Sequence, residues 1–269
     1  MRQQVERDKK RVHGEIDHLK SLIHPHIIKV LSCYQGFHDS SLTICVLLFS
    51  SGEHKLGLLL QQMGALFPLA PERINARSKI HKWFHCLASA LAYMHSRGIR
   101  HENVKPSNIV YLHDTVYFMD FSTSRRLEFS NVTSTATLAA ASRLFATPEA
   151  MHDGSDNLQR HGSKTDVVSL GLVFLEKYTV CCDRSIDELH QHLFGINTVV
   201  KQYHRAIHKL KDFTISDPMP NGVYIDCIQS TLQLERTNRS SAAEVNHAMM
   251  LRGDVSVRLN CPCHVRFKA

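Results

Sequence analysis

The sequence predicts an α+β fold in which a small first part with a strand pair precedes a larger, mainly helical part. Two β-prone runs, residues 27–34 and 42–49, lie close together early in the chain and favour a strand pair. Beyond residue 53 the apolar residues recur mainly at helical spacing, above all from about residue 74 to 97. A chain of 269 residues with 43% hydrophobic content is long enough to bury a core in each part.

The first part is expected to begin with an amphipathic helix from about residue 3 to 23. Its apolar positions, spaced as on one helix face, are Val12, Ile16, Leu19 and Ile23. The strand pair should follow, with residues 35–40 as its turn, and Ser50-Ser-Gly52 then interrupts the apolar pattern. These breaks predict three units, residues 1–52, 53–252 and a C-terminal tail at 253–269.

The second part is predicted to contain a long core helix at 74–97, stopped by Gly98. Short strands are expected at 109–112 and 116–119, joined by a hairpin turn at His113-Asp114. Residues 128–142, rich in Ser, Thr and Ala without a period, are typical of a mobile surface segment. Ser163-Lys-Thr-Asp166 resembles a capping box that opens an apolar helix. Further helices are expected at 185–194, 199–212, 222–233 and 240–250.

Charge and hydrophobicity argue against a nucleic-acid-binding, secreted or membrane-spanning protein. The net charge of +7 is spread along the chain, which fits a solvated surface better than a nucleic-acid interface. The N-terminal residues are charged throughout and lack the apolar core of a secretory signal, and the longest apolar run, residues 44–49, is too short for a membrane helix. We therefore expect an intracellular protein, cytoplasmic or nuclear, that binds neither nucleic acid nor membrane.

The eight cysteines are scattered, which indicates reduced thiols rather than a disulfide scaffold. Cys261-Pro-Cys263-His264 has residue types that bind metal, but no second pair at zinc-finger spacing accompanies it. The nineteen histidines also lack paired ligand spacing. The sequence therefore favours an ordinary cysteine-bearing tail over a metal site.

One stretch carries a specific resemblance. His101-Glu-Asn-Val-Lys-Pro-Ser-Asn108, followed by a predicted strand pair and Asp120-Phe-Ser122, resembles the catalytic loop and metal-binding triplet of eukaryotic protein kinases. Further kinase-like landmarks follow in order, namely Thr147-Pro-Glu149, Asp166-Val-Val-Ser-Leu-Gly171 and Arg239. Upstream, Glu15 to Ile28 is similar to the family's αC helix and its His-Pro-Asn-Ile-Val turn.

The resemblance implies a protein-kinase-like two-lobed fold, with a truncated small N-lobe and a mainly α-helical C-lobe. The run Asp120 to Ser124, together with Leu175-Glu176 and the cysteine-bearing end, is most similar to divergent serine/threonine kinase-like proteins of filamentous fungi. A protein partner or protein substrate is implied as well. The oligomeric state stays open.

The resemblance also assigns a site. It implies that Asn108 and Asp120 hold Mg²⁺ and that Lys105, with them, binds ATP and meets the transferred phosphate. Asn108 and Asp120 could equally serve only to cap loops. His101 is expected to have a scaffold role rather than a catalytic one, and Glu149, Asp166 and Arg239 are expected to be structural.

The departures from the family concern the chemistry itself. Asn103 stands where the family has its catalytic aspartate, and an amide is no base near neutral pH. Glu102 replaces an arginine that would grip a phosphorylated segment, and Ser122 replaces a glycine. The sequence has no Gly-x-Gly-x-x-Gly, and Lys9 and Lys10 share a predicted helix with Glu15, so they cannot act as the family's strand lysine. Binding of ATP and Mg²⁺ is therefore expected to be weak or lost.

These features leave three hypotheses for function. The first is a catalytically impaired pseudokinase that acts as a binding or regulatory module. The second is a serine/threonine protein kinase of low activity, in which positioning by Lys105, Asn108 and Asp120 supplies a residual rate. The third is a truncated fragment without a function of its own.

Overall fold

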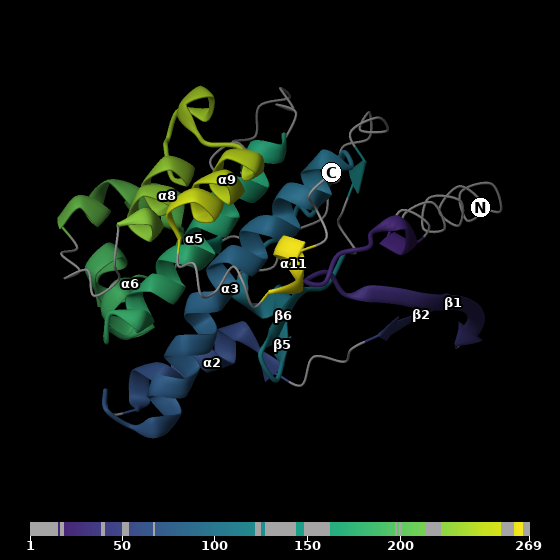
Figure 1. The fold of residues 1–269 in the computed structure, drawn as a ribbon, viewed down its shortest axis with the longest axis horizontal. Coiled ribbons are helices and arrows are strands. Elements are labelled where there is room, and N and C mark those ends of the chain that lie inside the picture. The colour runs from purple at the N-terminus through teal and green to yellow at the C-terminus, as the bar shows by residue number, and fades with distance from the viewer. Residues whose placement is uncertain are drawn as a thin grey trace.

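The structure is a computed structural model, and it describes most of the chain. The described residues are 16, 19–38, 41–49, 54–66, 68–121, 125–126, 144–147, 162–196, 198, 201–212, 222–253 and 261–265. The α+β class with a small first lobe and a mainly helical second lobe is confirmed (Figure 1). Most of the helix predicted at 3–23 and the whole segment 128–142 lie outside the described residues, although Ile16 and residues 19–21 are helical.

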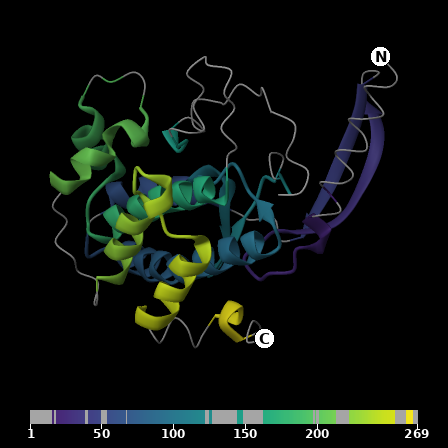
Figure 2. The ribbon, with the colours of Figure 1, turned by 90° about the horizontal axis from the view of Figure 1, so that it is seen from above.

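The predicted strand pair is present as an antiparallel ribbon of β1 (Lys29–His38) and β2 (Ser41–Phe49). Figures 1 and 2 show that this ribbon extends away from the helices. Its register runs from Lys29 opposite Phe49 to His38 opposite Ser41, with an irregularity after Val30. The prediction of a turn at 35–40 was therefore wrong at its start, because strand pairing continues to His38.

The segment before β1 is joined to the second part by backbone hydrogen bonds. Ile28 N donates to Phe118 O at 3.0 Å, and Phe118 N donates to His26 O at 3.0 Å. Ile27 thereby forms a parallel bridge with Phe118. These bonds fix the turn at residues 24–28 beside strand β6 (Thr115–Phe118).

Two helices and a small sheet follow the ribbon. Helix α2 (Leu56–Ala65) begins directly after β3 (His54–Lys55) and buries Leu56, Leu60 and Met63 on one face. Helix α3 (Pro71–Ser96) begins with a proline, which suits a first helical turn, and ends before Gly98, whose φ of 70° suits glycine. The prediction of a helix at 74–97 stopped by Gly98 is confirmed.

The sheet has the order β3-β5-β6, with β5 (Ile109–Leu112) antiparallel to both neighbours. Trp83 Nε1 on α3 donates to Asp114 O at 2.8 Å and so holds the β5–β6 hairpin against the helix. A second small pairing joins β4 (Ile99–Arg100) to β7 (Arg125–Arg126). The predicted hairpin at 109–119 is confirmed.

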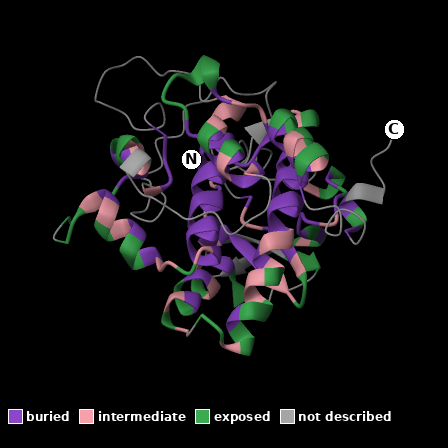
Figure 3. Cartoon of the chain, turned by 60° about the vertical axis from the view of Figure 1, so that its left-hand side comes forward, coloured by how far each residue is buried: buried purple, intermediate pink, exposed green. Residues whose placement is uncertain are grey.

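The centre of the helical lobe is α5 (Ser163–Cys181), which is buried along almost its whole length beside α3 (Figure 3). The rings of Phe84 on α3 and Phe174 on α5 lie 4.9 Å apart. The predicted capping box at Ser163 was wrong, because the N-cap residue is Gly162 and no side chain caps the helix. Asp166, which the prediction used as a cap, instead binds a loop described below.

The remaining helical elements pack around α3 and α5 (Figure 2), and the helices predicted at 185–194, 222–233 and 240–250 are present with shifted ends. The prediction of one helix at 199–212 was wrong, because a single α-helical turn there continues as a 3-10 helix. Capping boxes occur at α6, through Ser185 and Glu188, and at α9, through Ser241 and Glu244. These outer elements are α6 (Ile186–Phe194), α7 (Tyr203–Ala206), η4 (Ile207–Asp212), α8 (Val223–Thr231), η5 (Arg236–Asn238), α9 (Ala242–Arg252) and α11 (Pro262–Val265).

Candidate functional site

The loop from His101 to Asn108 is anchored by a buried carboxylate on α5. Asp166, only 2% exposed, accepts hydrogen bonds from His101 N and Glu102 N, each at 2.8 Å. His95 Nε2 lies 3.0 Å from the same carboxylate. Burial alone would raise the pKa of Asp166, but the hydrogen bond and charge of His95 outweigh it and lower the pKa overall. Asp166 is thus an ionised anchor for the loop, as the structural role implied.

His101 is fully buried and links the loop to the end of β6. Because a carbonyl can only accept, His101 Nε2 donates to Met119 O at 3.0 Å, and His101 Nδ1 accepts from Asn103 N at 3.3 Å. Burial lowers the pKa of His101, although the charge of Asp166 opposes this. A neutral histidine with both nitrogens engaged suits the scaffold role that the sequence suggested.

Asn103, Asn108 and Asp120 meet at one place. Asn103 Nδ2 lies 3.4 Å from Asp120 Oδ2, and since a carboxylate only accepts, the amide N–H of Asn103 faces it. Asn108 Nδ2 donates to Asn103 O at 2.9 Å, while Met119 N donates to Asn108 O at 3.0 Å. The loop residues Asn103 and Asn108 are therefore held next to Asp120 in the same small region.

Lys105 belongs to this group electrostatically. Partial burial lowers the pKa of its ammonium, the carboxylate of Asp120 raises it, and Lys55 at the end of β3 lowers it. η1 (Pro106–Asn108) follows Lys105 and begins with a proline. The arrangement places one cation, one carboxylate and two amides together, which is a donor set for a phosphate and a hard metal ion.

Glu102 forms an ion pair with a neighbouring arginine. Arg100 Nη2, on the buried Arg100 of β4, lies 3.4 Å from Glu102 Oε1. Glu102 also adopts a φ of 61°, in the left-handed region that costs free energy for a residue with a Cβ. Asp120 has the same φ of 61°, although aspartate tolerates it better. The two residues with these unusual conformations lie next to Asn103, Glu102 in the sequence and Asp120 across the site.

Other predicted landmarks are placed only in part. Glu15, Ser122 and Glu149 lie outside the described residues, so the structural role expected for Glu149 stays a prediction. Arg239 is buried, and its guanidinium donates to Gln233 O at 2.6 Å and to Leu234 O at 2.8 Å. Thr147, from the kinase-like Thr-Pro-Glu run, is fully buried.

A second group of reactive side chains was missed by the sequence reasoning. His26, Cys86, Cys261 and Cys263 are all buried, and their ligand atoms lie within 4.8 Å of one another. The sequence reasoning looked for a second cysteine pair, whereas the other two candidate ligands come from the turn before β1 and from α3. The Cys-Pro-Cys spacing was the available signal.

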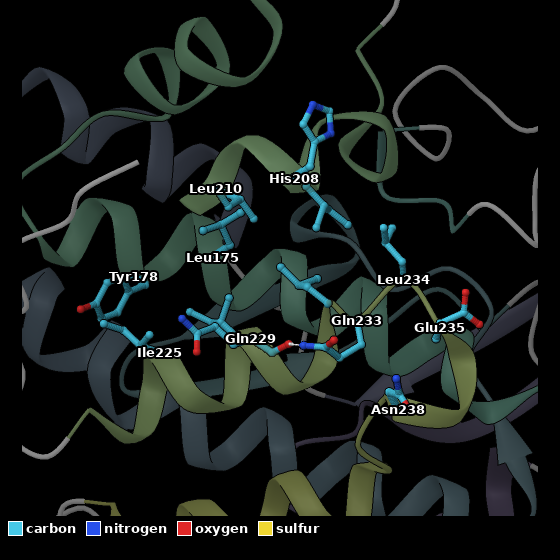
Figure 4. A pocket seen from close by; sticks show the side chains of 13 residues that line it. Leu175, Tyr178, His208, Leu210, Ile225, Gln229, Gln233, Leu234, Glu235 and Asn238 are labelled. Carbon is cyan, nitrogen blue, oxygen red and sulfur yellow. Dashed lines mark hydrogen bonds between the residues drawn. The ribbon is translucent and has the colours of Figure 1, made fainter. Parts of the chain in front are cut away.

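The structure also has a cavity of about 770 Å³ beside α5 and α8 (Figure 4). Its lining is mostly apolar and comes from α5, η4, α8 and η5, with Gln233 Nε2 donating to Gln229 O at 2.9 Å at its edge. None of Asn103, Lys105, Asn108 and Asp120 lines it. Separately, no helix among the described residues is long and apolar enough to cross a membrane.

Comparisons with known proteins agree with this geometry. A family model described as the protein kinase domain matches residues 1–250. A mitogen-activated protein kinase kinase kinase, bck1, of Aspergillus fumigatus is 27% identical over 165 residues, which is 61% of this chain and 9% of that protein. The calcium/calmodulin-dependent protein kinase cmkA of Emericella nidulans is 27% identical over 229 residues, 80% of this chain and 50% of that protein.

A third relative, the serine/threonine-protein kinase ATG1 of Kluyveromyces lactis, is 24% identical over 242 residues, covering 79% of this chain and 27% of that protein. The matched region therefore spans half or less of the length of these three relatives. These identities establish similarity of sequence.

Proposed function

The chain belongs to the protein kinase domain family, and from that premise we propose that it acts as a pseudokinase, a binding or regulatory module with little or no phosphotransfer. The observation that carries the proposal is the side chain in the place of the catalytic base. Asn103 presents an amide N–H toward Asp120 at 3.4 Å, so this position donates a hydrogen bond where the reaction requires a proton acceptor. Loss of a general base typically lowers a rate by about 10²- to 10⁴-fold.

Nucleotide binding is a separate matter, and the residues present fit MgATP in part. Asn108 Nδ2 donates to Asn103 O, so the amide oxygen of Asn108 remains to bind a cation. That cation would lie beside the Asp120 carboxylate. Lys105 would contact phosphate oxygens. MgATP would supply the transferable phosphoryl group. We propose that these residues retain weak Mg²⁺-dependent nucleotide binding.

The same donor set supports the runner-up, a serine/threonine protein kinase of low activity. Lys105, Asn108 and Asp120 keep the residue types that hold and orient phosphate and metal, and orientation alone supplies some rate. The two proposals therefore differ only in whether turnover is measurable.

A protein partner is also proposed. The described part of the ribbon exposes large apolar side chains, with Tyr34 63% exposed and Phe49 62% exposed. Exposed apolar surface of this kind is common where another protein binds. An intracellular location is proposed as well, since the cysteines among the described residues are free thiols, as in a reducing compartment.

The test compares the wild-type chain with Asn103→Asp, Asp120→Asn and, as a charge-matched control, Asn238→Asp on exposed η5. MgATP binding is measured by calorimetry, and phosphotransfer is measured with a generic protein substrate. We expect binding that Asp120→Asn abolishes, no wild-type turnover above the Asp120→Asn background, and a gain only in Asn103→Asp. Wild-type turnover that Asp120→Asn removes would refute the pseudokinase proposal in favour of the low-activity kinase.

A further inference from the structure

We propose that His26, Cys86, Cys261 and Cys263 form a structural Zn²⁺ site that clamps the C-terminal segment onto the body of the protein. The four residues come from three distant stretches of the chain, namely the turn before β1, helix α3 and the start of α11. The site is separate from the Asn103 region and does not depend on the proposed function.

The ligand atoms already lie at the separations of a coordination shell. Cys261 Sγ is 3.0 Å from His26 Nε2 and 3.5 Å from Cys86 Sγ, and all four ligand atoms lie within 4.8 Å of one another. In a tetrahedral site with Zn–S bonds of about 2.3 Å, neighbouring ligand atoms are about 3.5 to 3.8 Å apart. Cys261 Sγ and Cys263 Sγ, at 2.7 Å, would need to separate by about 1 Å to meet these bond lengths.

His26 is oriented as a metal-binding histidine. Its Nδ1 lies 2.9 Å from Val116 O, and because a carbonyl only accepts, the proton is on Nδ1. The lone pair of Nε2 then points toward Cys261 Sγ. A backbone carbonyl that fixes the tautomer in this way is the common outer-shell partner of zinc-binding histidines.

Burial adds a second argument. His26 and Cys263 are each 2% exposed, Cys86 is 4% exposed and Cys261 is 8% exposed. Single buried cysteines are ordinary core residues, but three thiols converging on one imidazole nitrogen in the interior are not explained by packing alone. A bound cation would neutralise the thiolates and satisfy all four side chains together.

The donor set selects the metal. Three sulfur ligands and one imidazole are the Cys₃His set of structural zinc sites, and soft thiolates disfavour Mg²⁺ or Ca²⁺. With four protein ligands the shell is closed, so no position is left for a substrate or a reactive water. The site is therefore structural rather than catalytic.

The clamp would fix a particular part of the fold. Helix α11 lies against α3 (Figure 1). Without a metal, α11 has only four residues to hold it in place, too few for a helix that is stable alone. His26 also accepts, through its backbone oxygen, the hydrogen bond from Phe118 N, so the site adjoins the strand that leads to Asp120.

The experiment uses the full chain of 269 residues, expressed without a polyhistidine tag and purified under reducing conditions without chelator. Metal content is measured by mass spectrometry of the elements. After the zinc is replaced with Co²⁺, the visible absorption of tetrahedral cobalt and the thiolate-to-cobalt charge-transfer bands are recorded. We expect about one zinc per chain and a tetrahedral, thiolate-rich cobalt spectrum.

Cys86→Ser and Cys261→Ser are the test variants, and Cys227→Ser, which changes a buried thiol on α8 outside the cluster, is the matched control. Each test variant should weaken zinc binding by more than about 10-fold, and the control should leave it unchanged. A folded wild-type chain that holds well under stoichiometric zinc and takes up no Co²⁺ would overturn the proposal. A Cys261–Cys263 disulfide in the freshly purified protein would overturn it too, and neither result requires a variant to fold.

Discussion

A buried lysine on α5 gives the sharpest test of the energetics of the helical core. Lys177 has no exposed surface, and its Nζ has no hydrogen-bond partner within the described part of the chain. Its ammonium lies 3.8 Å from the ring centroid of Phe84 and 5.2 Å from that of Phe174. Burial lowers the pKa of Lys177 from 10.5 to about 7, and nearby Cys181 and Cys86 only partly oppose this.

The perturbation is Lys177→Met, which keeps the apolar stem and removes the charge. The two pKa values differ by about 3.5, and at 1.36 kcal/mol for each unit of pKa the charged form costs the fold about 5 kcal/mol. Because the folded pKa lies below the unfolded one, the unfolded state binds more protons between pH 7 and 10.5, and stability rises with pH in that window. The cost is complete below about pH 7 and absent above 10.5.

We therefore expect the variant to unfold at a higher urea concentration than the wild type at pH 6, with an unfolding free energy that is larger by up to about 5 kcal/mol. Above pH 7 this difference in unfolding free energy should shrink by about 1.4 kcal/mol per pH unit. The control is Lys201→Met, which removes an exposed amine and should leave no such pH-dependent gap. Measuring unfolding free energies at pH 6, 8 and 9.5 separates the cases. A gap that is the same at all three values, or a variant less stable than the wild type at pH 6, would refute the reasoning.

Four further substitutions test the packing, the loop anchor and the helix cap. Gly171→Ala should lower the unfolding free energy measured in urea by about 1–3 kcal/mol, because a Cβ there would come within 2.8 Å of Thr231 Cβ. Gly57→Ala should instead raise it by about 0.5–1 kcal/mol, because a Cβ on this α2 residue would make only ordinary contacts of 3.5 Å or more. Asp166→Asn should lower the unfolding free energy at pH 7 by about 3–5 kcal/mol, measured by thermal or urea unfolding. Because folding lowers the pKa of Asp166, the difference in unfolding free energy from the wild type should shrink only as the pH falls below 3.8. Ser241→Ala removes the α9 cap and should lower stability by about 1 kcal/mol, with an unchanged helix content by circular dichroism as the check on the fold.

The elements that sequence reasoning placed correctly are those whose signal is local. α3 combines a long helical apolar period with a glycine stop, although it begins at Pro71, before the predicted start, and the β5–β6 hairpin joins two short β-prone runs. The kinase-like loop was recognisable because its residue types occur in order and at fixed spacing. The structure then brings Asn103, Asn108 and Asp120 together as that order implied.

The failures have a physical cause in each case. Ser163-Lys-Thr-Asp166 has the pattern of a capping box, but the Asp166 carboxylate binds the backbone of His101 and Glu102 instead, and local pattern cannot show that competition. Helix α2 was not singled out because Gly57 and Gly64 lower its helix propensity, although Leu56, Leu60 and Met63 supply the apolar face that packing uses.

The cluster of His26, Cys86, Cys261 and Cys263 illustrates a different limit. Cys261 lies 235 residues from His26 and 175 from Cys86, so the Cys-Pro-Cys spacing reveals only two of the four residues and the sequence contains no compact zinc motif. These four side chains meet because the backbone of Phe118 holds the turn at residues 24–28 beside β6 and because α11 packs on α3. Such a site must be read from the tertiary structure.

The same strand connects the two sites. β6 receives the backbone of His26 at Phe118, and two residues later the chain reaches Asp120, whose left-handed φ of 61° must be held by its surroundings. A metal bound at the cluster would therefore fix the turn at 24–28 against β6 from one side, while His101 and Met119 O fix the strand end from the other. Loss of the metal is expected to loosen the hold on Asp120 without touching its side chain. A weaker MgATP affinity in Cys86→Ser, with Cys227→Ser unchanged, would show that coupling, and equal affinities in the two variants would exclude it.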